Sequence, residues 1–339
     1  MNYMVKDENA IYYECGFSSD NALFLKLGSE SFFITDSRYS VEANELVRGA
    51  LVIINGDLYG EARELIKKSQ IKKISYDPKE WTIFAFESLK KDLKIKFKAM
   101  PDFSHKKRVV KSSQELLLLK KAATLGAKAF DELGELIKKH GFKEDENMLT
   151  FMGKAMLSQK GKYELSFDPI TAINENAAKP HALPTSKKLK KNDLLLVDAG
   201  LKYKRYCSDR TRTISASKDF EFGYEQKFKK KKVQKAYDLV LKAHDNAIDK
   251  ARSGMKAKKI DAFTRDIIEK GGMGEYYVHS TGHGVGLDIH EMPYISAKSE
   301  MKVEDGMVYT IEPGIYIPGE FGIRIEDMVV MENGRVVVL

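Results

Sequence analysis

Cysteine is scarce in this sequence, which has only Cys15 and Cys207 among its 339 residues. Two cysteines are too few for a disulfide framework, and their scarcity suits a reducing compartment. The sequence has no run of about 18 apolar residues, so a membrane span is not expected. The first residues, MNYMVKDENAIYYECGF, lack a basic segment followed by an apolar one, so no signal peptide is expected. We therefore expect a cytoplasmic protein without a membrane partner.

Acidic residues are fewer than basic residues, and the formal net charge is +8. An excess of positive charge raises the question of nucleic-acid binding. The densest basic run is KFKKKKVQK, residues 227–235, which leads into a helical pattern. Neither an interleaved aromatic platform nor a known nucleic-acid motif accompanies this run. We interpret it as the solvated start of a helix and expect no nucleic-acid partner.

The first hundred residues alternate between strand-like and helix-like patterns. Strands are predicted at residues 22–28, 31–36, 50–55, 72–77 and 94–100, and helices at residues 40–49, 58–70 and 81–93. This alternation indicates a small α/β domain. The polar stretch 100–113 has no clear period and marks the end of that domain. We predict an N-terminal domain over residues 1–105.

The rest of the chain, residues 112–339, predicts a larger second domain of the α+β type. Helices are predicted at residues 113–140, 146–159, 223–251 and 257–271. After residue 165 strands dominate the pattern between these helices. A chain of 339 residues with 43% hydrophobic residues is long enough for two domains that each have a core.

Two segments of the second domain resemble each other. They are LLLVDAGLKYKRYCSDRTRTI, residues 194–214, and VYTIEPGIYIPGEFGIRIEDMVVM, residues 308–331. Each has an apolar strand, an acid, a glycine two residues later, a turn, and a second strand with another acid. The likeness suggests an internal duplication that yields two equivalent hairpins.

The turns of these hairpins predict which acids face each other. If the first hairpin turns at residues 203–204, Asp198 faces Asp209. If the second is centred on the glycine of IPGEF, Glu312 faces Glu326. Directly paired residues point to the same face of the sheet, with Cβ atoms about 4.5–5.5 Å apart.

Four converging carboxylates need a counter-charge, because like charges that face each other destabilise a strand pair. Two divalent ions would balance four negative charges, and two metals about 3.5–4 Å apart suit such a set of ligands. Oxygen ligands favour manganese or a related first-row ion over structural zinc. The alternative is that all four acids are solvent-facing strand residues. Their paired placement within apolar strands favours the metal site.

Three of the seven histidines lie in one stretch, HSTGHGVGLDIHE, residues 279–291. His279 and His283 have the spacing of two zinc ligands on a helix, but Gly282, Gly284 and Gly286 make a helix improbable. The HExxH arrangement is also absent. The glycines instead predict a narrow extended or looped backbone that lets another group approach closely. The alternative is a glycine-rich surface loop whose histidines are incidental.

The segments VDAGLKYKRYCSDRTRT, HSTGHGVGLDIHE, TIEPGIY and GIRIED resemble, in order and spacing, the pita-bread metallopeptidases. The resemblance is to the branch of Xaa-Pro aminopeptidases and Xaa-Pro dipeptidases (prolidases), and it covers nearly the whole chain. ITDSRYSVEA, residues 34–43, looks like the creatinase-type N-terminal domain of these enzymes. The resemblance implies a C-terminal pita-bread fold preceded by a smaller creatinase-like α/β domain.

The resemblance also implies roles for individual residues. Five residues match the family's ligands of two divalent metal ions, with manganese expected and cobalt or zinc as alternatives: Asp198, Asp209, His283, Glu312 and Glu326. Asp209 and Glu326 match the ligands that bridge both ions, and Glu312 also matches the general base. His279 and His290 match histidines near the scissile carbonyl. His181 matches a substrate-contacting histidine, and Arg324 matches an arginine that either contacts substrate or pairs with nearby carboxylates.

The activity implied is hydrolysis of the Xaa-Pro bond at the N-terminus of proline-containing peptides, with a homodimer as the expected assembly. A prolidase restricted to dipeptides is the first alternative. A methionine aminopeptidase would lack the N-terminal domain, and a creatinase would lack the metal ligands. A catalytically inactive peptide- or nucleic-acid-binding relative is the non-enzymatic alternative. One departure from the family is Arg205, because glycine is usual at this position in the first turn.

Overall fold

A computed structural model describes residues 1–140 and 142–339. The chain divides into two compact units, Met1–Arg108 and Val109–Leu339. The sequence predicted one domain that ends at residue 105 and a second that begins at residue 112. These domain limits remain a prediction.

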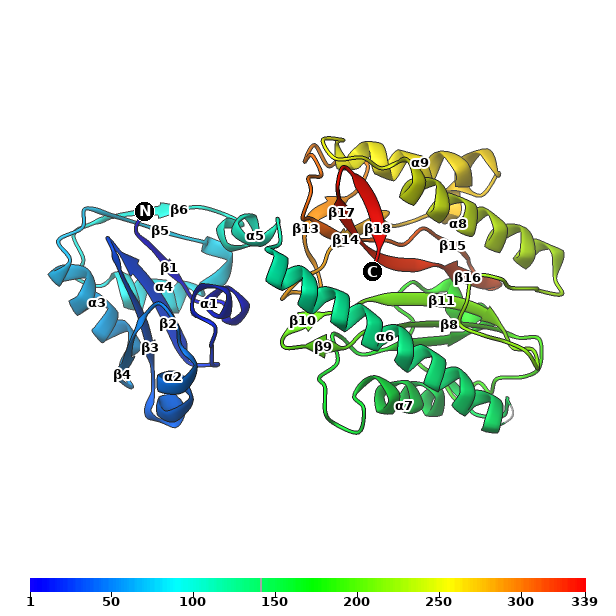
Figure 1. Ribbon diagram of the computed structural model, residues 1–339, viewed down its shortest axis with the longest axis horizontal. Helices are drawn as coiled ribbons and strands as arrows, with labels where there is room; N and C mark the ends of the chain where they lie inside the picture. Colours follow the sequence, from blue (N-terminus) through cyan, green and yellow to red (C-terminus); the bar gives the residue numbers. More distant parts are fainter. Residues whose placement is uncertain (141) are drawn as a thin grey trace. The chain divides into compact units, whose positions relative to one another are not determined.

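Unit 1 contains a mixed sheet with the strand order β4-β3-β2-β1-β5-β6 (Figure 1). Its strands are β1 (Tyr3–Val5), β2 (Ala22–Leu27), β3 (Glu30–Thr35), β4 (Leu51–Ile54), β5 (Lys73–Tyr76) and β6 (Lys96–Ala99). Its helices are α1 (Glu8–Cys15), η1 (Ser37–Tyr39), α2 (Ser40–Leu46), α3 (Leu58–Lys68), η2 (Pro78–Glu80), α4 (Ile83–Lys90) and α5 (Phe103–Arg108). The elements predicted between residues 22 and 100 are confirmed, with ends that differ by a few residues.

The core of unit 1 lies on both faces of this sheet, because successive side chains of a strand point to opposite faces. Leu23 and Leu25 of β2 pack in one apolar cluster with residues of α3 and α4. Ala22 and Phe24 pack in another with residues of α1 and α2. Burial on both faces explains why β2 reads as a nearly continuous apolar run.

Unit 2 contains a sheet with the strand order β13-β12-β14-β17-β11-β8-β7, and β18 pairs with β17 (Figure 1). Its strands are β7 (Ile170–Ile173), β8 (Leu194–Ala199), β9 (Lys202–Tyr203), β10 (Tyr206–Cys207), β11 (Arg210–Ser215), β12 (Gly282–Gly284), β13 (Glu291–Ile295), β14 (Val308–Ile311), β15 (Gly314–Ile317), β16 (Phe321–Arg324), β17 (Glu326–Glu332) and β18 (Arg335–Val338). Its helices are α6 (Ser113–His140), α7 (Glu146–Leu157), η3 (Asn174–Ala178), α8 (Lys231–Lys250), α9 (Ala257–Lys270) and η4 (Gly274–Tyr276).

The helices of unit 2 cover different parts of this sheet, with α6 and α7 on one side and α8 and α9 on the other in Figure 1. Leu195, Val197 and Ala199 of β8 pack with α6 and α7. Leu194 and Leu196, which alternate with them, pack in the cluster of α8. Asp198 is two residues beyond Leu196, so its side chain lies on the same face of β8 as Leu194 and Leu196. Its carboxylate therefore points away from α6 and α7.

One predicted helix begins later than its pattern suggested. The prediction was residues 223–251, but α8 begins at Lys231. Residues 223–230 precede the helix as irregular chain, so the first part of the basic run 227–235 is a loop. The start lacks a side-chain cap, which explains why no local signal marked it.

The two predicted hairpins are present and meet at the centre of the sheet. The first is built from β8 and β11, the second from β14 and β17, and β11 pairs with β17 so that Thr211 lies opposite Glu326. In the second hairpin Ile311 lies opposite Asp327 and Gly314 opposite Arg324. This is the predicted register, in which Glu312 faces Glu326.

The predicted register of the first hairpin is wrong by two residues. Asp198 lies opposite Thr211, not Asp209. The reason is the turn, which is formed by Lys204 and Arg205 with φ of 48° and 69°. Two central residues with positive φ are typical of the two-residue turn that matches the twist of a hairpin. An arginine adopts this conformation here although glycine would adopt it with less strain.

Candidate metal centre

A cavity of about 680 Å³ opens within unit 2. It is lined by every site residue predicted from the sequence: His181, Asp198, Asp209, His279, His283, His290, Glu312, Arg324 and Glu326. Three of the predicted ligands are strand residues, with Asp198 on β8, His283 on β12 and Glu326 at the start of β17. These strands all belong to the central sheet, so the ligands come from distant parts of the chain to one place.

Three of the predicted ligands form the tightest group. Asp209, His283 and Glu326 each offer one ligand atom, and these atoms all lie within 4.8 Å of one another. Glu312 lies beside them, with its Oε1 3.4 Å from the Nε2 of His283. Carboxylate oxygen and imidazole nitrogen at such separations suit a shared divalent cation.

The imidazole of His283 is held in the form that a metal requires. Its Nδ1 lies 3.1 Å from the carbonyl oxygen of Gly284, which can only accept, so Nδ1 carries the proton and Nε2 presents its lone pair. Burial, followed by the neighbouring His290, lowers the pKa of His283 to about 3. The ring is therefore neutral at physiological pH.

The buried carboxylates repel one another in the absence of a cation. Burial, followed by the charge of Glu326, raises the pKa of Asp209 well above its usual range. Glu326 is raised in pKa in the same direction by burial and then by Glu312. The pKa of Glu312 rises to about 8, with burial as the main cause and Asp198 as a contributor. Cations between the four carboxylates would remove this cost.

Asp198 supplies a second sign that the residues present fit a metal. Its Oδ2 accepts a hydrogen bond of 2.6 Å from Nη2 of Arg324. Its Oδ1 is buried and has no hydrogen-bond partner among the residues that the structure describes. A buried carboxylate oxygen without a partner is costly unless another ligand binds it. The donor set therefore fits divalent cations.

Arg324 is bonded to the protein on every side of its guanidinium. Besides its bond to Asp198, it donates from Nε to the hydroxyl of Thr211 at 3.0 Å and from Nη1 to the hydroxyl of Tyr316 at 2.7 Å. Nη1 also lies 3.3 Å from the carbonyl oxygen of Pro180. The sequence left two roles open for Arg324, contact with substrate and pairing with nearby carboxylates. Its bond to Asp198 is of the second kind, and its other bonds are also to groups of the protein.

The histidines that were not expected as ligands differ in their surroundings. His279 is held at both ring nitrogens, by the carbonyl oxygen of Ser280 at 2.7 Å and the hydroxyl of Tyr316 at 2.9 Å. The ring of His290 stands edge-on to that of His283, with centroids 4.2 Å apart. His181 is exposed and its side chain extends from the loop after η3.

Two residues of the site were missed in the sequence. Thr211 donates a hydrogen bond of 2.6 Å to Oε2 of Glu326 and accepts one from Arg324. Tyr316 joins Arg324 to His279. Thr211 follows Asp209 by two residues, and this period-2 spacing is a signal that could have placed both on one face. Tyr316 offered no comparable signal, because its partners lie on other elements.

A comparison of the sequence with models of known protein families identifies the family of unit 2. Residues 118–333 match metallopeptidase family M24. The chain belongs to metallopeptidase family M24. Residues 2–110 match the creatinase/prolidase N-terminal domain that accompanies it here. The family and the pairing of a creatinase-type domain with a pita-bread domain, both predicted from the sequence, are confirmed.

Relatives with solved structures share the whole architecture of this M24 chain. An Xaa-Pro dipeptidase from Bacillus anthracis has a TM-score of 0.90 at 30% identity, over 99% of this chain and 92% of that one. An X-Pro aminopeptidase from Thermotoga maritima has a TM-score of 0.87 at 28% identity, over 99% and 94%. In sequence, an Xaa-Pro dipeptidase of Pyrococcus furiosus is 32% identical over 98% of this chain and 91% of its own length. Family M24 binds two divalent metal ions, and the donor set described above fits them.

Proposed function

We propose that this M24 peptidase hydrolyses the Xaa-Pro bond at the N-terminus of proline-containing peptides. The observation that supports the proposal most strongly is the group of Asp209, His283 and Glu326, whose ligand atoms lie within 4.8 Å of one another. Asp198 and Glu312 line the same cavity and complete the set of five ligands. The names of the solved relatives, Xaa-Pro dipeptidase and X-Pro aminopeptidase, supply the substrate class.

The metal ions, when bound, supply an activated water and polarise the scissile carbonyl. Glu312 takes the proton of the attacking water as general base. The hydroxyl of Thr310 donates to its Oε1 at 3.1 Å, which holds the carboxylate in one orientation. His290 contacts the scissile carbonyl and the charge that develops on it. His279 lines the same cavity beside it, with both ring nitrogens bonded within the protein. His181 contacts the substrate from the exposed side of the cavity.

Arg324 acts in this proposal as a group that positions others. It fixes one oxygen of Asp198 and leaves the other, Oδ1, as the atom that would bind a metal ion. It also holds Tyr316, which holds the Nε2 of His279. This chain of bonds supports pairing with local groups over direct contact with substrate.

Manganese is the metal we propose, because four of the five ligands are carboxylates, and cobalt or zinc would be substitutes. We also propose a cytoplasmic location and a homodimer. Within the described ranges 1–140 and 142–339, no helix combines the length and apolarity that a membrane crossing requires.

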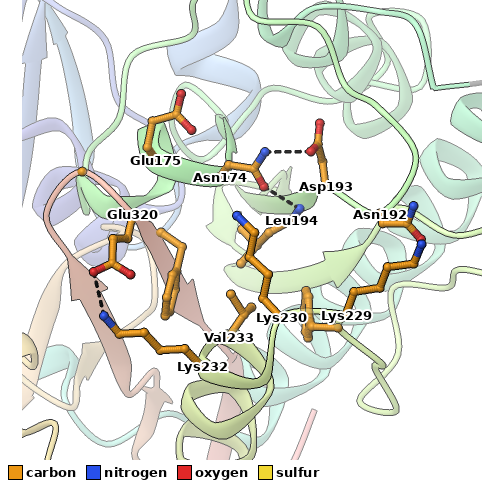
Figure 2. Close-up of a pocket in the computed structure, with 13 residues that line it drawn as sticks. Asn174, Glu175, Asn192, Asp193, Leu194, Lys229, Lys230, Lys232, Val233 and Glu320 are labelled. Atoms are coloured by element: carbon orange, nitrogen blue, oxygen red, sulfur yellow. Dashed lines mark hydrogen bonds and ion pairs between the residues drawn. The ribbon is translucent and has the colours of Figure 1, made fainter.

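The basic run does not favour a nucleic-acid role. A separate pocket of about 290 Å³ lies near the start of α8. Lys229, Lys230 and Lys232 are among the residues that line it (Figure 2). Lys232 pairs there with Glu320 at 2.6 Å. Asp193 also lines this pocket, so charges of both signs face it. These contacts support the interpretation of a solvated helix start.

The test of the proposed function compares an Xaa-Pro dipeptide with an Xaa-Pro-Xaa tripeptide, before and after chelation. We expect chelation to abolish turnover and added Mn²⁺ to restore it. Cleavage of the dipeptide alone would select the prolidase alternative, which the names of the relatives from B. anthracis and P. furiosus favour. Full turnover by rigorously metal-free protein would refute the dinuclear mechanism.

A further inference from the structure

Glu146 is a buried carboxylate that belongs neither to the metal ligands nor to a helix cap. It is the first residue of α7 and has an exposed fraction of 0%. The helix is capped by Asp145, whose side chain accepts from the backbone N–H of Met148. The carboxylate of Glu146 is therefore available for contacts outside its own helix, although burying a charge without partners is costly.

Those contacts all go to one stretch of chain. Oε1 accepts from the backbone N–H of Ile173 at 2.6 Å. Oε2 accepts from the backbone N–H and the hydroxyl of Thr185, at 2.7 and 2.6 Å, and from Nδ2 of Asn176 at 2.8 Å. A carboxylate has about four acceptor positions, so the acceptor capacity of Glu146 is filled.

The donors bracket residues 174–185, which we call the cleft segment. Ile173 is the last residue of β7 before it, and Thr185 is its last residue. Asn176, near its start, also donates to the carbonyl oxygen of Leu183 near its end, at 3.0 Å. One buried carboxylate thus ties both ends of the cleft segment together, which limits its freedom as a loop.

The middle of the cleft segment forms a wall of the metal cavity. Pro180, His181, Ala182, Leu183 and Pro184 all line it. The side chain of His181 is exposed, so packing does not hold it. Its position is set by the backbone on which it stands, and that backbone is held at its ends by Glu146.

A second contact seats the cleft segment against β16. A Cβ added at Gly322 would lie 1.8 Å from the carbonyl oxygen of Ala177, so only glycine permits this approach. Two residues along β16, Arg324 reaches the carbonyl oxygen of Pro180. The cleft segment therefore lies between Glu146 on one side and the strand that carries Arg324 on the other.

We propose that Glu146 is a positioning residue for substrate binding, which fixes the cleft segment so that His181 faces the metal cavity. The proposal rests on the proposed function, because it gives His181 a substrate to contact. A glutamine at this position would keep one acceptor oxygen and turn an amide N–H₂ towards a backbone N–H, of Ile173 or of Thr185, which can only donate. Glu146→Gln therefore loosens the segment without changing the shape of the side chain.

The first experiment measures hydrogen–deuterium exchange of the full-length protein. We expect Glu146→Gln to speed exchange within residues 174–185 and to leave the metal content of the manganese-loaded protein at the wild-type ratio. Asp77→Asn is the matched control. Asp77 is a carboxylate of unit 1 with an exposed fraction of 4%, and it accepts from the backbone N–H groups of Lys79 and Phe103 at 3.0 Å each. Its replacement should leave exchange in the cleft segment unchanged.

The second experiment is a double-mutant cycle on Xaa-Pro hydrolysis. Misplacement of a substrate-positioning group by about 1 Å can cost a hundredfold in rate, so we expect Glu146→Gln to lower kcat/KM about tenfold to a hundredfold, mainly through KM. The loss should largely vanish in a His181→Ala background, because the positioned group is gone. If Glu146→Gln fails to fold, Thr185→Val removes one of the four hydrogen bonds and serves in its place.

Two results would overturn the proposal. One is unchanged exchange within residues 174–185 in a folded Glu146→Gln or Thr185→Val protein. The other is a double variant whose loss of kcat/KM equals the product of the losses of Glu146→Gln and His181→Ala alone, as expected of a general structural defect. Failure of the proposed function is distinguishable, because a wild-type protein without Xaa-Pro activity would leave the exchange experiment valid.

Discussion

The hydroxyl of Tyr316 joins two groups of the site, and its removal tests how the site is held. Tyr316 is buried, accepts from Nη1 of Arg324 at 2.7 Å and lies 2.9 Å from Nε2 of His279. Because Nδ1 of His279 donates to a carbonyl oxygen, Nε2 accepts a hydrogen bond from the tyrosine hydroxyl. Tyr316→Phe removes both hydrogen bonds and keeps the ring in place.

The size of the effect follows from the two bonds. A hydrogen bond to a charged group contributes about 1.5–3 kcal/mol, and a neutral one about 0.5–1.5 kcal/mol. Nη1 of Arg324 retains its longer bond to Pro180, which offsets part of the loss. We therefore expect the free energy of unfolding to fall by about 2 kcal/mol. We expect kcat to fall while metal content stays the same, because the ring of His279 loses one of the two hydrogen bonds that hold it.

Denaturant unfolding and steady-state kinetics measure these effects, and Tyr309→Phe is the control. Tyr309 is buried on β14, and its hydroxyl has no hydrogen-bond partner within the described part of the chain, so its removal should cost nothing. Burial, followed by the charge of Arg324, lowers the pKa of His279 to about 4, so the kinetic defect should be constant between pH 6 and 9. Equal stability and kinetics for the two variants would refute the reasoning.

Three further outcomes are expected. His283→Ala should lower metal content and rate, whereas His290→Ala should keep the metals and lose rate; equal metal loss by elemental analysis would contradict these roles. Cys15 and Cys207 should resist alkylation at pH 7 in the folded protein, because burial raises their thiol pKa values to about 11 and 12; rapid labelling detected by mass spectrometry would disprove this. Glutamine at all four lysines of residues 229–232 should leave Xaa-Pro hydrolysis nearly unchanged, and loss of a specific, salt-sensitive nucleic-acid complex would reveal a second function.

Local patterns predicted most of the fold because they report burial. The alternation of strands with helices from β2 to β6 is visible in the sequence, and so is the helical period along the whole of α6. These elements were all located within a few residues. The three-residue strand β1 was missed, because three residues are too short to show a period. Its place between β2 and β5 comes from tertiary pairing.

The site was predicted as far as its residues carry chemistry of their own. Acids and histidines at the ends of apolar strands stand out, and all of them line one cavity. The register of the first hairpin was wrong because it depends on positive φ at Lys204 and Arg205, a conformation that residue type does not announce. Tyr316 was missed because its importance comes from Arg324, which reaches it from a neighbouring strand.

The pairing of β11 with β17 has a consequence for synthesis on the ribosome. Thr211 is synthesised before its partner Glu326, which lies 115 residues further along the chain. At about 5–20 residues per second, the edge of β11 stays uncovered for about 6–23 s. An uncovered strand edge is a template for pairing with other chains. Slower translation lengthens that interval, so newly made chains should depend on chaperones most strongly just before β17 emerges.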